Sequence, residues 1–205
     1  MVIGSRRMKL PSVGKMLGDY AEGDIVLLNE SGSPVEFYVA KHDYEPELNG
    51  SGRTLLVRKA AHSKQVWDAD GGSTYDGSDI DAWLNGDYKA LLDKSVQNAI
   101  GVTKINMSAA ASSILERSVF LLWSAELFSD GWKLPIADTL NLAPGGAFWL
   151  RTDGPMSGYA FFSYGQSGAT YSTGSSKSAY NAVPCFTLPA TAKFDPNTNE
   201  FKGVA

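Results

Sequence analysis

The residues that could carry acid–base chemistry are few. The chain has two histidines, His42 and His62, and neither lies in a hydrolase or metalloprotease motif. Three nearby carboxylates, Asp76, Asp79 and Asp81, could supply a general acid and a general base. Helix capping and solvation explain these carboxylates with fewer assumptions. We therefore predict that the chain is not an enzyme, and an enzyme that uses Asp76, Asp79 or His62 is kept as a third hypothesis.

An acidic stretch before the expected helix resembles a calcium loop in part. It begins with Asp68 and Asp70 at the first and third positions. The sixth position, however, is Ser73 and the twelfth is Asp79, where a calcium loop needs glycine and a bidentate glutamate. No cofactor or metal is predicted, and calcium is left as an alternative. The single cysteine, Cys185, lies in a strand-like run, so we expect a buried, inert thiol.

The clearest functional signal is a neutral, tyrosine-rich segment in the C-terminal half. Between Gly154 and Ala192 the one charged residue is Lys177, and residues 158–181 are two-thirds Tyr, Ser, Gly and Thr. Binding surfaces of antibody type have this composition, because tyrosine gives a large contact with few rotors while serine and glycine adapt around it. A pair of glycine-rich core strands with ordinary turns is the structural alternative.

Strand alternation divides the aromatic residues of this segment between two faces. In a strand over residues 158–164, Tyr159 and Phe161 share one face. Phe162 and Tyr164 share the other face, so one face can pack while the opposite one is presented.

The chain that follows is expected to display further contacts. Residues 174–181 are predicted to form an exposed loop with Lys177 and Tyr180 at its crest. Aromatic residues would anchor an interface there, and polar ones would adapt to it. The predicted ligand-binding residues are Tyr159, Phe161, Tyr164, Gln166, Tyr171, Ser175, Lys177 and Tyr180.

The first half of the chain predicts a hairpin followed by a helical region. β-rich runs at 24–29 and 35–42 flank a Ser-Gly-Ser-Pro turn, and a third strand follows at 54–58. Ser78 opens a helix with apolar residues at helical spacing, and residues 85–87 are expected to break it in two.

The second half predicts more strands between long loops. Asp93 can cap a further helical turn that stops at Gly101. A strand is expected at 102–106, an exposed loop at 108–113, a buried strand at 119–123 and irregular chain at 132–146. An antiparallel meander over 147–151, 158–164, 169–173 and 183–188 follows, then a loosely ordered polar tail from Asp195.

Composition bounds the class of protein. A chain of 205 residues that is 43% hydrophobic can bury a sizeable core, and no internal linker forces a division. The net charge of −4 argues against a nucleic-acid binder. No apolar run approaches the length of a membrane span, and the first residues lack the apolar region of a secretory signal. The class expected is α+β, with antiparallel strands, two or three short helices and long irregular loops.

Short motifs along the chain resemble those of a widespread uncharacterised family of gut bacteria and their phages. That family typically carries S-x-I-x-x-W-L-N, F-L-L-S, W-W-L-R-S and R-P-A, often beside tail genes. Two positions depart from the pattern: Val183 replaces Arg, and Thr152 replaces Ser. The matching residues are Ser78, Ile80, Trp83, Leu84 and Asn85, then Val119, Phe120, Leu121, Leu122, Ser124 and Glu126, then Phe148, Trp149, Leu150 and Arg151, then Val183, Pro184, Cys185 and Phe186.

This resemblance implies a single C-type lectin-like domain. The same fold is used by the variable proteins of diversity-generating retroelements, such as phage tropism determinants, in which a C-terminal segment is diversified. It implies a leader at 1–10, the domain at 11–192 with a displayed segment at 152–181, and a tail at 193–205. The expected core residues are Trp83, Leu84, Phe120, Leu121, Trp149 and Leu150.

The function implied is non-enzymatic recognition of a ligand or receptor. The expected protein is a phage tail or receptor-binding protein, with diversification as an option, located in the virion or at an extracellular surface. Its partners would be a host-cell surface receptor (protein or glycan), other virion proteins and further copies of itself, but neither nucleic acid nor a membrane interior. The alternative is a structural virion subunit or decoration protein whose aromatic segment makes subunit contacts.

Overall fold

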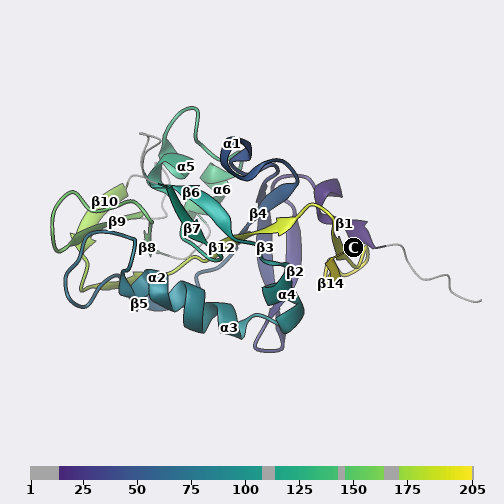
Figure 1. The fold of residues 1–205 in the computed structure, drawn as a ribbon, viewed down its shortest axis with the longest axis horizontal. Helices are drawn as coiled ribbons and strands as arrows, with labels where there is room; N and C mark the ends of the chain where they lie inside the picture. Colours follow the sequence, from purple (N-terminus) through teal and green to yellow (C-terminus); the bar gives the residue numbers. More distant parts are fainter. Residues whose placement is uncertain (1–13, 108–113, 143–145, 164–170, 205) are drawn as a thin grey trace, which may run out of the picture.

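The computed structural model describes residues 14–107, 114–142, 146–163 and 171–204, and most of its regular structure is antiparallel sheet (Figure 1). This confirms the predicted α+β class with few short helices. The strands are β1 (Lys15–Met16), β2 (Ile25–Glu30), β3 (Ser33–Lys41), β4 (Arg53–Arg58), β5 (Lys64–Val66), β6 (Thr103–Asn106), β7 (Ile114–Arg117), β8 (Phe148–Trp149), β9 (Tyr159–Ser163), β10 (Tyr171–Ser175), β11 (Ala179–Asn181), β12 (Cys185–Pro189), β13 (Ala192–Phe194) and β14 (Phe201–Val204).

Short helices lie on both sides of these sheets (Figure 1). None of those in the described residues is long and apolar enough to cross a membrane. They are the 3-10 turn η1 (Leu17–Asp19), α1 (Pro46–Asn49), α2 (Asp79–Trp83), the π-helical η2 (Leu84–Tyr88), α3 (Lys89–Leu91), α4 (Lys94–Ala99), α5 (Ser124–Phe128) and α6 (Ala137–Leu142).

The predicted hairpin and third strand form part of a four-stranded sheet of order β12-β4-β3-β2. Ser31 and Gly32 both have positive φ, at 50° and 78°, as a two-residue type I′ hairpin turn requires. The fourth strand corrects the predicted meander, because β12 pairs with β4 through Cys185 opposite Val57 and not with the aromatic strands. Both β4 and β12 are buried along most of their length, so apolar alternation could not indicate their neighbours.

The helical region begins as predicted, with the backbone N–H of Asp81 donating to Ser78 Oγ. The expected break at 85–87 is wrong, since α2, η2 and α3 run on continuously through a π-turn. Asn85 lies in this turn, and its side-chain amide reaches across to the backbone of Val119. A π-turn inserts extra backbone into a helix without ending it, which is how this polar sequence is accommodated.

Strand β6 confirms the strand predicted at 102–106, and α4 the further helical turn. Gly101 does not act as a left-handed helix stop. A Cβ there would lie 2.5 Å from an Arg53 guanidinium nitrogen, so a larger residue would require the end of the Arg53 side chain to shift. The loop predicted at 108–113 lies outside the described residues.

The centre of the molecule is an extended buried segment where a strand was predicted. At 119–123 only Phe120 pairs in a β-bridge, with Cys185, and its flanking residues are buried without strand partners. Their backbone groups bond to the side chains of Asn85 and Arg151 instead, which replaces a strand ladder. The core prediction holds for Leu84, Phe120, Leu121, Trp149 and Leu150, whereas Trp83 is half-buried.

The five-stranded sheet, of order β10-β9-β8-β11-β5, occupies one end of the molecule (Figure 1). Trp149 in β8 is its centre: the ring is fully buried and its Nε1 donates to the carbonyl oxygen of Gln65 at 2.8 Å. The ring of Trp67 packs against it with centroids 5.6 Å apart. Two tryptophans therefore pin the sheet to the rest of the core.

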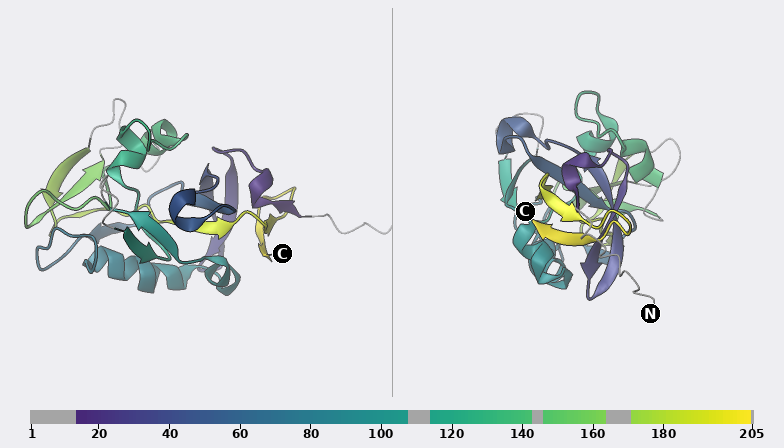
Figure 2. Two further views of the ribbon diagram at one scale, coloured as in Figure 1. Left: turned by 45° about the horizontal axis from the view of Figure 1, so that its top comes forward. Right: turned by 90° about the vertical axis from the view of Figure 1, so that its right-hand side faces the viewer.

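The opposite end is a three-stranded sheet, β1-β13-β14, which holds both ends of the described chain (Figures 1 and 2). The expectation of a loosely ordered tail is wrong, because Phe201 packs on Phe194 in this sheet. The expectation of irregular chain at 132–146 is wrong for Ala137–Leu142, since α6 buries Ala137 and Leu140 one helical turn apart, and residues 143–145 lie outside the described residues.

Candidate binding surface

Strand β9 has the predicted division of faces. Phe162 is buried, whereas Tyr159 is 42% exposed and Phe161 is half-buried. The register of the β9–β10 pair puts Ser175 opposite Tyr159, and Thr173 opposite Phe161. Directly opposed residues of an antiparallel pair project to the same side. We call the surface formed by Tyr159, Phe161, Thr173 and Ser175 the aromatic face.

The buried side of β9 anchors the aromatic face. The ring of Phe162 stacks on that of Tyr180, with centroids 4.4 Å apart, and Tyr180 contacts the edge of Trp149 at 4.7 Å. Gly174 in β10 makes room for this stack, because a Cβ there would lie 2.9 Å from Phe162 Cε1. The rigid aromatic cluster beneath the sheet limits how far Tyr159 can move.

The prediction that Tyr180 stands at the crest of an exposed loop is wrong. Tyr180 lies in β11 between β8 and β5, where its half-buried ring is part of the aromatic cluster. Residues 174–181 form strand ends and a short turn instead of a loop, because Ser176 is buried and its carbonyl oxygen accepts from the N–H groups of Trp67 and Asp68 at 3.1 Å.

Ser175 and Lys177 are exposed, as predicted, at the turn between β10 and β11. The N–H of Ser176 donates to Gly158 at 2.8 Å, so the turn is tied to the start of β9. The Lys177 side chain extends over Gly71, where a Cβ would lie 3.0 Å from Lys177 Cε. A single cation thus borders the aromatic face.

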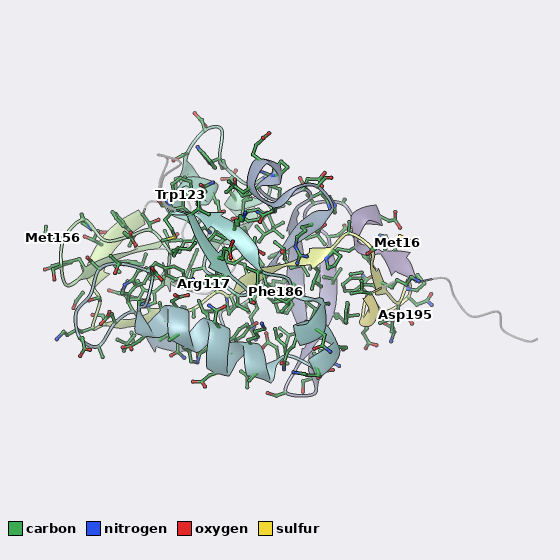
Figure 3. The ribbon with its side chains drawn as sticks, in the orientation of Figure 1. Met16, Arg117, Trp123, Met156, Phe186 and Asp195 are labelled. Atoms are coloured by element: carbon green, nitrogen blue, oxygen red, sulfur yellow. The ribbon has the colours of Figure 1, made fainter. Side chains whose placement is uncertain are left out.

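Met156 was not predicted and is the most exposed large hydrophobic side chain that the structure describes at this end, at 61% (Figure 3). It precedes β9 in a turn closed by a hydrogen bond from the N–H of Tyr159 to its carbonyl oxygen. The tyrosine and serine content of the segment did not mark Met156 as a contact residue. Its position between Pro155 and Gly158 could have done so, because a methionine on a turn can make an adaptable apolar contact.

The remaining predicted contacts are only partly described. Tyr164 and Gln166 lie outside the described residues. The backbone of Tyr171 opens β10 opposite Ser163. The candidate surface therefore consists of the aromatic face together with Met156 and Lys177.

The acidic residues hold the loops that flank β5 and α2. Asp76 and Asp81 pair with Arg117, and Asp79 accepts from the N–H of Ala69 at 2.8 Å. Asp68 accepts from two successive N–H groups of its own loop. The described residues contain no group of three or more metal-ligating side chains. In the described residues these carboxylates pair with Arg117 or accept backbone hydrogen bonds that close the loops.

The histidines lie apart from the aromatic face and from each other. His42 bonds to Thr54 Oγ1 and to the carbonyl oxygen of Tyr20, at 2.9 and 2.8 Å. The His62 ring packs between Trp83 and Tyr88, and burial lowers the pKa of His62. Both histidines are packed as structural residues.

A small polar cavity of about 130 Å³ lies between β2, α4 and β14, away from the aromatic face. Two of its carboxylates are already bonded, Asp93 to the amide of Asn29 and Glu200 to Lys202. None of the predicted ligand-binding residues lines this cavity.

The motif residues are scaffold residues. Arg151 is fully buried and donates to both carboxylate oxygens of Glu126 at 2.9 Å. Burial alone would lower the pKa of Arg151, but the Glu126 carboxylate raises it overall. Cys185 is buried as predicted, with Sγ 3.0 Å from the carbonyl oxygen of Phe120, and burial raises the pKa of its thiol.

Comparison with known proteins finds one family whose description names no function. A family described as a domain of unknown function (DUF6273) matches residues 51–190, which span β4 to β12 and include the aromatic face. No curated protein and no solved structure matches the chain significantly. The match covers more than half of the chain, and the chain therefore belongs to the DUF6273 family.

Proposed function

We propose that this chain is a non-enzymatic recognition module with a C-type lectin-like fold. The observation that carries the proposal is the exposure of Tyr159 and Met156, at 42% and 61%, on a neutral sheet end. Large, weakly hydrated side chains of this kind supply most of the binding energy when a partner covers them. Ser175 and Lys177 beside them would make adaptable polar contacts.

The anchoring of the surface supports this proposal. Tyr159 is the first residue of β9. Phe162, three residues further along the same strand, is held in the aromatic cluster by its stacking on Tyr180. A surface held in place before binding loses little conformational entropy when the partner arrives.

The arrangement of the ends also favours display. The aromatic face and the three-stranded terminal sheet lie at opposite ends of the long axis (Figures 1 and 2). Met156 and Met16 mark these two ends (Figure 3). Attachment through the terminal sheet would point the aromatic face away from the attachment point.

The partner that we propose is a host-cell surface receptor, recognised by a phage tail or receptor-binding protein. Location in the virion and diversification of residues 152–181 are parts of the same proposal, and they rest on the resemblance of the motifs. Other virion proteins and further copies of the chain are its proposed assembly partners. Repeated copies would raise a weak single-site affinity through avidity.

A binding measurement with matched variants tests the proposal. Purified protein is passed over envelope fractions of candidate host cells, beside a Met156→Ser, Tyr159→Ser double variant. The control is Met16→Ser, which removes an apolar side chain of 41% exposure at the opposite end. We expect the double variant to lose binding at least about tenfold and the control to keep it. Equal retention of all three proteins would overturn the assigned surface.

Sequence variation between isolates distinguishes the proposed receptor-binding function from the structural alternative. A diversified binding segment predicts that substitutions between isolates of one lineage concentrate at residues 152–181. A decoration protein that uses the aromatic face for subunit contacts predicts substitutions spread evenly along the chain.

A further inference from the structure

The outer edge of β10 differs from the other sheet edges. Within the residues that the structure describes, β10 pairs only with β9. Its sequence, Tyr-Ser-Thr-Gly-Ser, contains no charged residue and no proline. An edge strand leaves a row of backbone N–H and C=O groups free to pair with another chain, and proteins usually block such edges with charge, proline or a covering segment.

The edges of the four-stranded sheet are covered by other parts of the chain. The N–H of Leu27 in β2 donates to the carbonyl oxygen of Asn199 at 2.8 Å. At the opposite edge, Phe120 and Cys185 exchange two backbone hydrogen bonds of 2.9 Å. These segments occupy the ladder positions that a second chain would need.

The smaller sheets use side chains for the same purpose. Asn49 imitates a neighbouring strand at β6, because its Oδ1 accepts from the N–H of Lys104 at 2.8 Å and its Nδ2 donates to the Lys104 carbonyl oxygen at 3.0 Å. The edge strands β1, β7 and β14 of these sheets each contain at least one charged residue, and so does β5 at the far edge of the five-stranded sheet. Strand β10 has neither form of protection over residues 171–174, whereas the carbonyl oxygen of its last residue, Ser175, already accepts from the N–H of Ser178 at 2.9 Å.

We propose that β10 pairs antiparallel with β10 of a second copy of this chain. A two-fold axis beside Thr173 makes the strand complementary to itself, with Thr173 opposite Thr173 and Ser172 opposite Gly174. The register also brings together two β-branched side chains, a favourable cross-strand pair. The chain carries a net charge of −4, so copies repel one another in general, and a strand without charge is where they can approach.

The pairing joins two five-stranded sheets into one continuous sheet. Thr173 and Ser175 lie on the same side as Tyr159 and Phe161, so the aromatic faces of both copies would lie side by side on the joined sheet. This consequence rests on the proposed function, because two adjacent faces matter only if they bind. The pairing itself can be measured without any ligand.

Charge variants of one residue test the pairing. Thr173→Lys places two ammonium groups opposite each other across the two-fold axis, and Thr173→Glu places two carboxylates there. The mass of each purified protein is measured by sedimentation velocity over a range of concentrations. We expect the unaltered chain to form a reversible dimer and each variant alone to dissociate at least about tenfold more readily, because like charges directly opposed repel.

An equimolar mixture of the two variants provides the decisive measurement. Lys opposite Glu replaces repulsion with attraction, so the mixture should recover the dimer that neither variant forms alone. Circular dichroism spectra that match the unaltered chain would establish that both variants fold. A chain that stays monomeric at every concentration overturns the pairing, as does equal dimerisation of both variants, which would place the contact elsewhere. Failure of the unaltered dimer to bind any envelope fraction would instead overturn the proposed function and leave the pairing intact.

Discussion

Arg151 and Glu126 form a two-pronged ion pair enclosed at the centre of the molecule. The guanidinium Nη1 and Nη2 atoms each lie 2.9 Å from a different carboxylate oxygen, and the two side chains are 0% and 1% exposed. Tyr44 donates its hydroxyl hydrogen to the same carboxylate, and Arg151 also donates to the carbonyl oxygens of Leu121 and Asn106. The pair therefore joins the chain that follows β8 to α5 and to the buried segment around Phe120.

Removing one partner of this pair should destabilise the fold strongly. Arg151→Met leaves the Glu126 carboxylate buried without its cation, and such an uncompensated charge costs about 3–5 kcal/mol. Urea unfolding followed by tryptophan fluorescence measures the loss. Lys133→Met is the matched control, since the Lys133–Asp138 pair is exposed and should contribute about 0–1 kcal/mol. An equal loss in the two variants would contradict a special role for the buried pair.

The sequence indicates local features well because their physical causes lie within a few residues. The type I′ hairpin at Ser31 and the cap at Ser78 both depend on turn chemistry that is read directly from neighbouring residues. The partner of Arg151 could not be read in this way, because Glu126 lies 25 positions away and the two meet only through packing. Pairing of β12 with β4 is nonlocal for the same reason.

Close backbone packing at Gly154 gives a second prediction. A Cβ at this position would lie 1.7 Å from the carbonyl oxygen of Tyr159, so alanine must displace the turn that carries Met156. We expect Gly154→Ala to cost about 1–3 kcal/mol and to speed amide hydrogen exchange in β9. Gly86→Ala is the control, because a Cβ there meets no atom within 4 Å. Unchanged exchange in Gly154→Ala would contradict the proposed contact.

Only part of the candidate surface could be predicted from composition. Tyrosine content marked Tyr159 correctly as exposed, but it also marked Tyr180, whose ring stacks on Phe162. A tyrosine suits both environments, and the strand order that buries Tyr180 between β8 and β5 is a tertiary feature. Met156 escaped notice because a lone methionine contributes little to composition.

The buried thiol of Cys185 makes stability depend on alkaline pH. Burial raises the pKa of Cys185 in the folded chain above its ordinary value of 9.0. Below pH 9 the Cys185 thiol is protonated in both the folded and the unfolded chain. Above pH 9 the unfolded chain loses this proton while the folded chain keeps it. The free energy of unfolding should therefore be level below pH 9 and then fall, by up to about 1.4 kcal/mol per pH unit for this group.

Cys185→Ala isolates the contribution of the thiol. Burial also raises the pKa of Tyr44, Tyr75 and Tyr88, so a further decline begins near pH 10 in both proteins. The variant should lack the decline that starts near pH 9, as measured by urea unfolding at a series of pH values. Rapid reaction of the native thiol with a disulfide reagent at pH 8 would show that Cys185 is accessible to solvent, and would contradict the burial that raises its pKa.

The final prediction concerns Asn85, which joins the π-turn to the buried segment. Its Nδ2 donates to the carbonyl oxygen of Val119 at 3.0 Å, and its Oδ1 accepts from the N–H groups of Ser118 and Val119 at 3.2 and 3.1 Å. These bonds replace the ladder that a strand would have provided. Asn85→Ala leaves the backbone groups of Val119 buried without partners, at about 1–3 kcal/mol for each group left unsatisfied.

The matched control for Asn85 is Asn98→Ala, which removes an exposed asparagine from α4. Urea unfolding should show a loss of about 2–4 kcal/mol for Asn85→Ala and a change within about 0.5 kcal/mol for the control. Asn85→Asp keeps the acceptor oxygen but brings a second carboxylate next to Asp81, whose Oδ1 now accepts from Asn85 Nδ2. This variant should regain stability as the pH falls and its carboxylate is protonated, whereas Asn85→Ala should not. Identical pH profiles for the two variants would mean that the donor half of the amide contributes little, and that the acceptor contacts alone hold the segment in place.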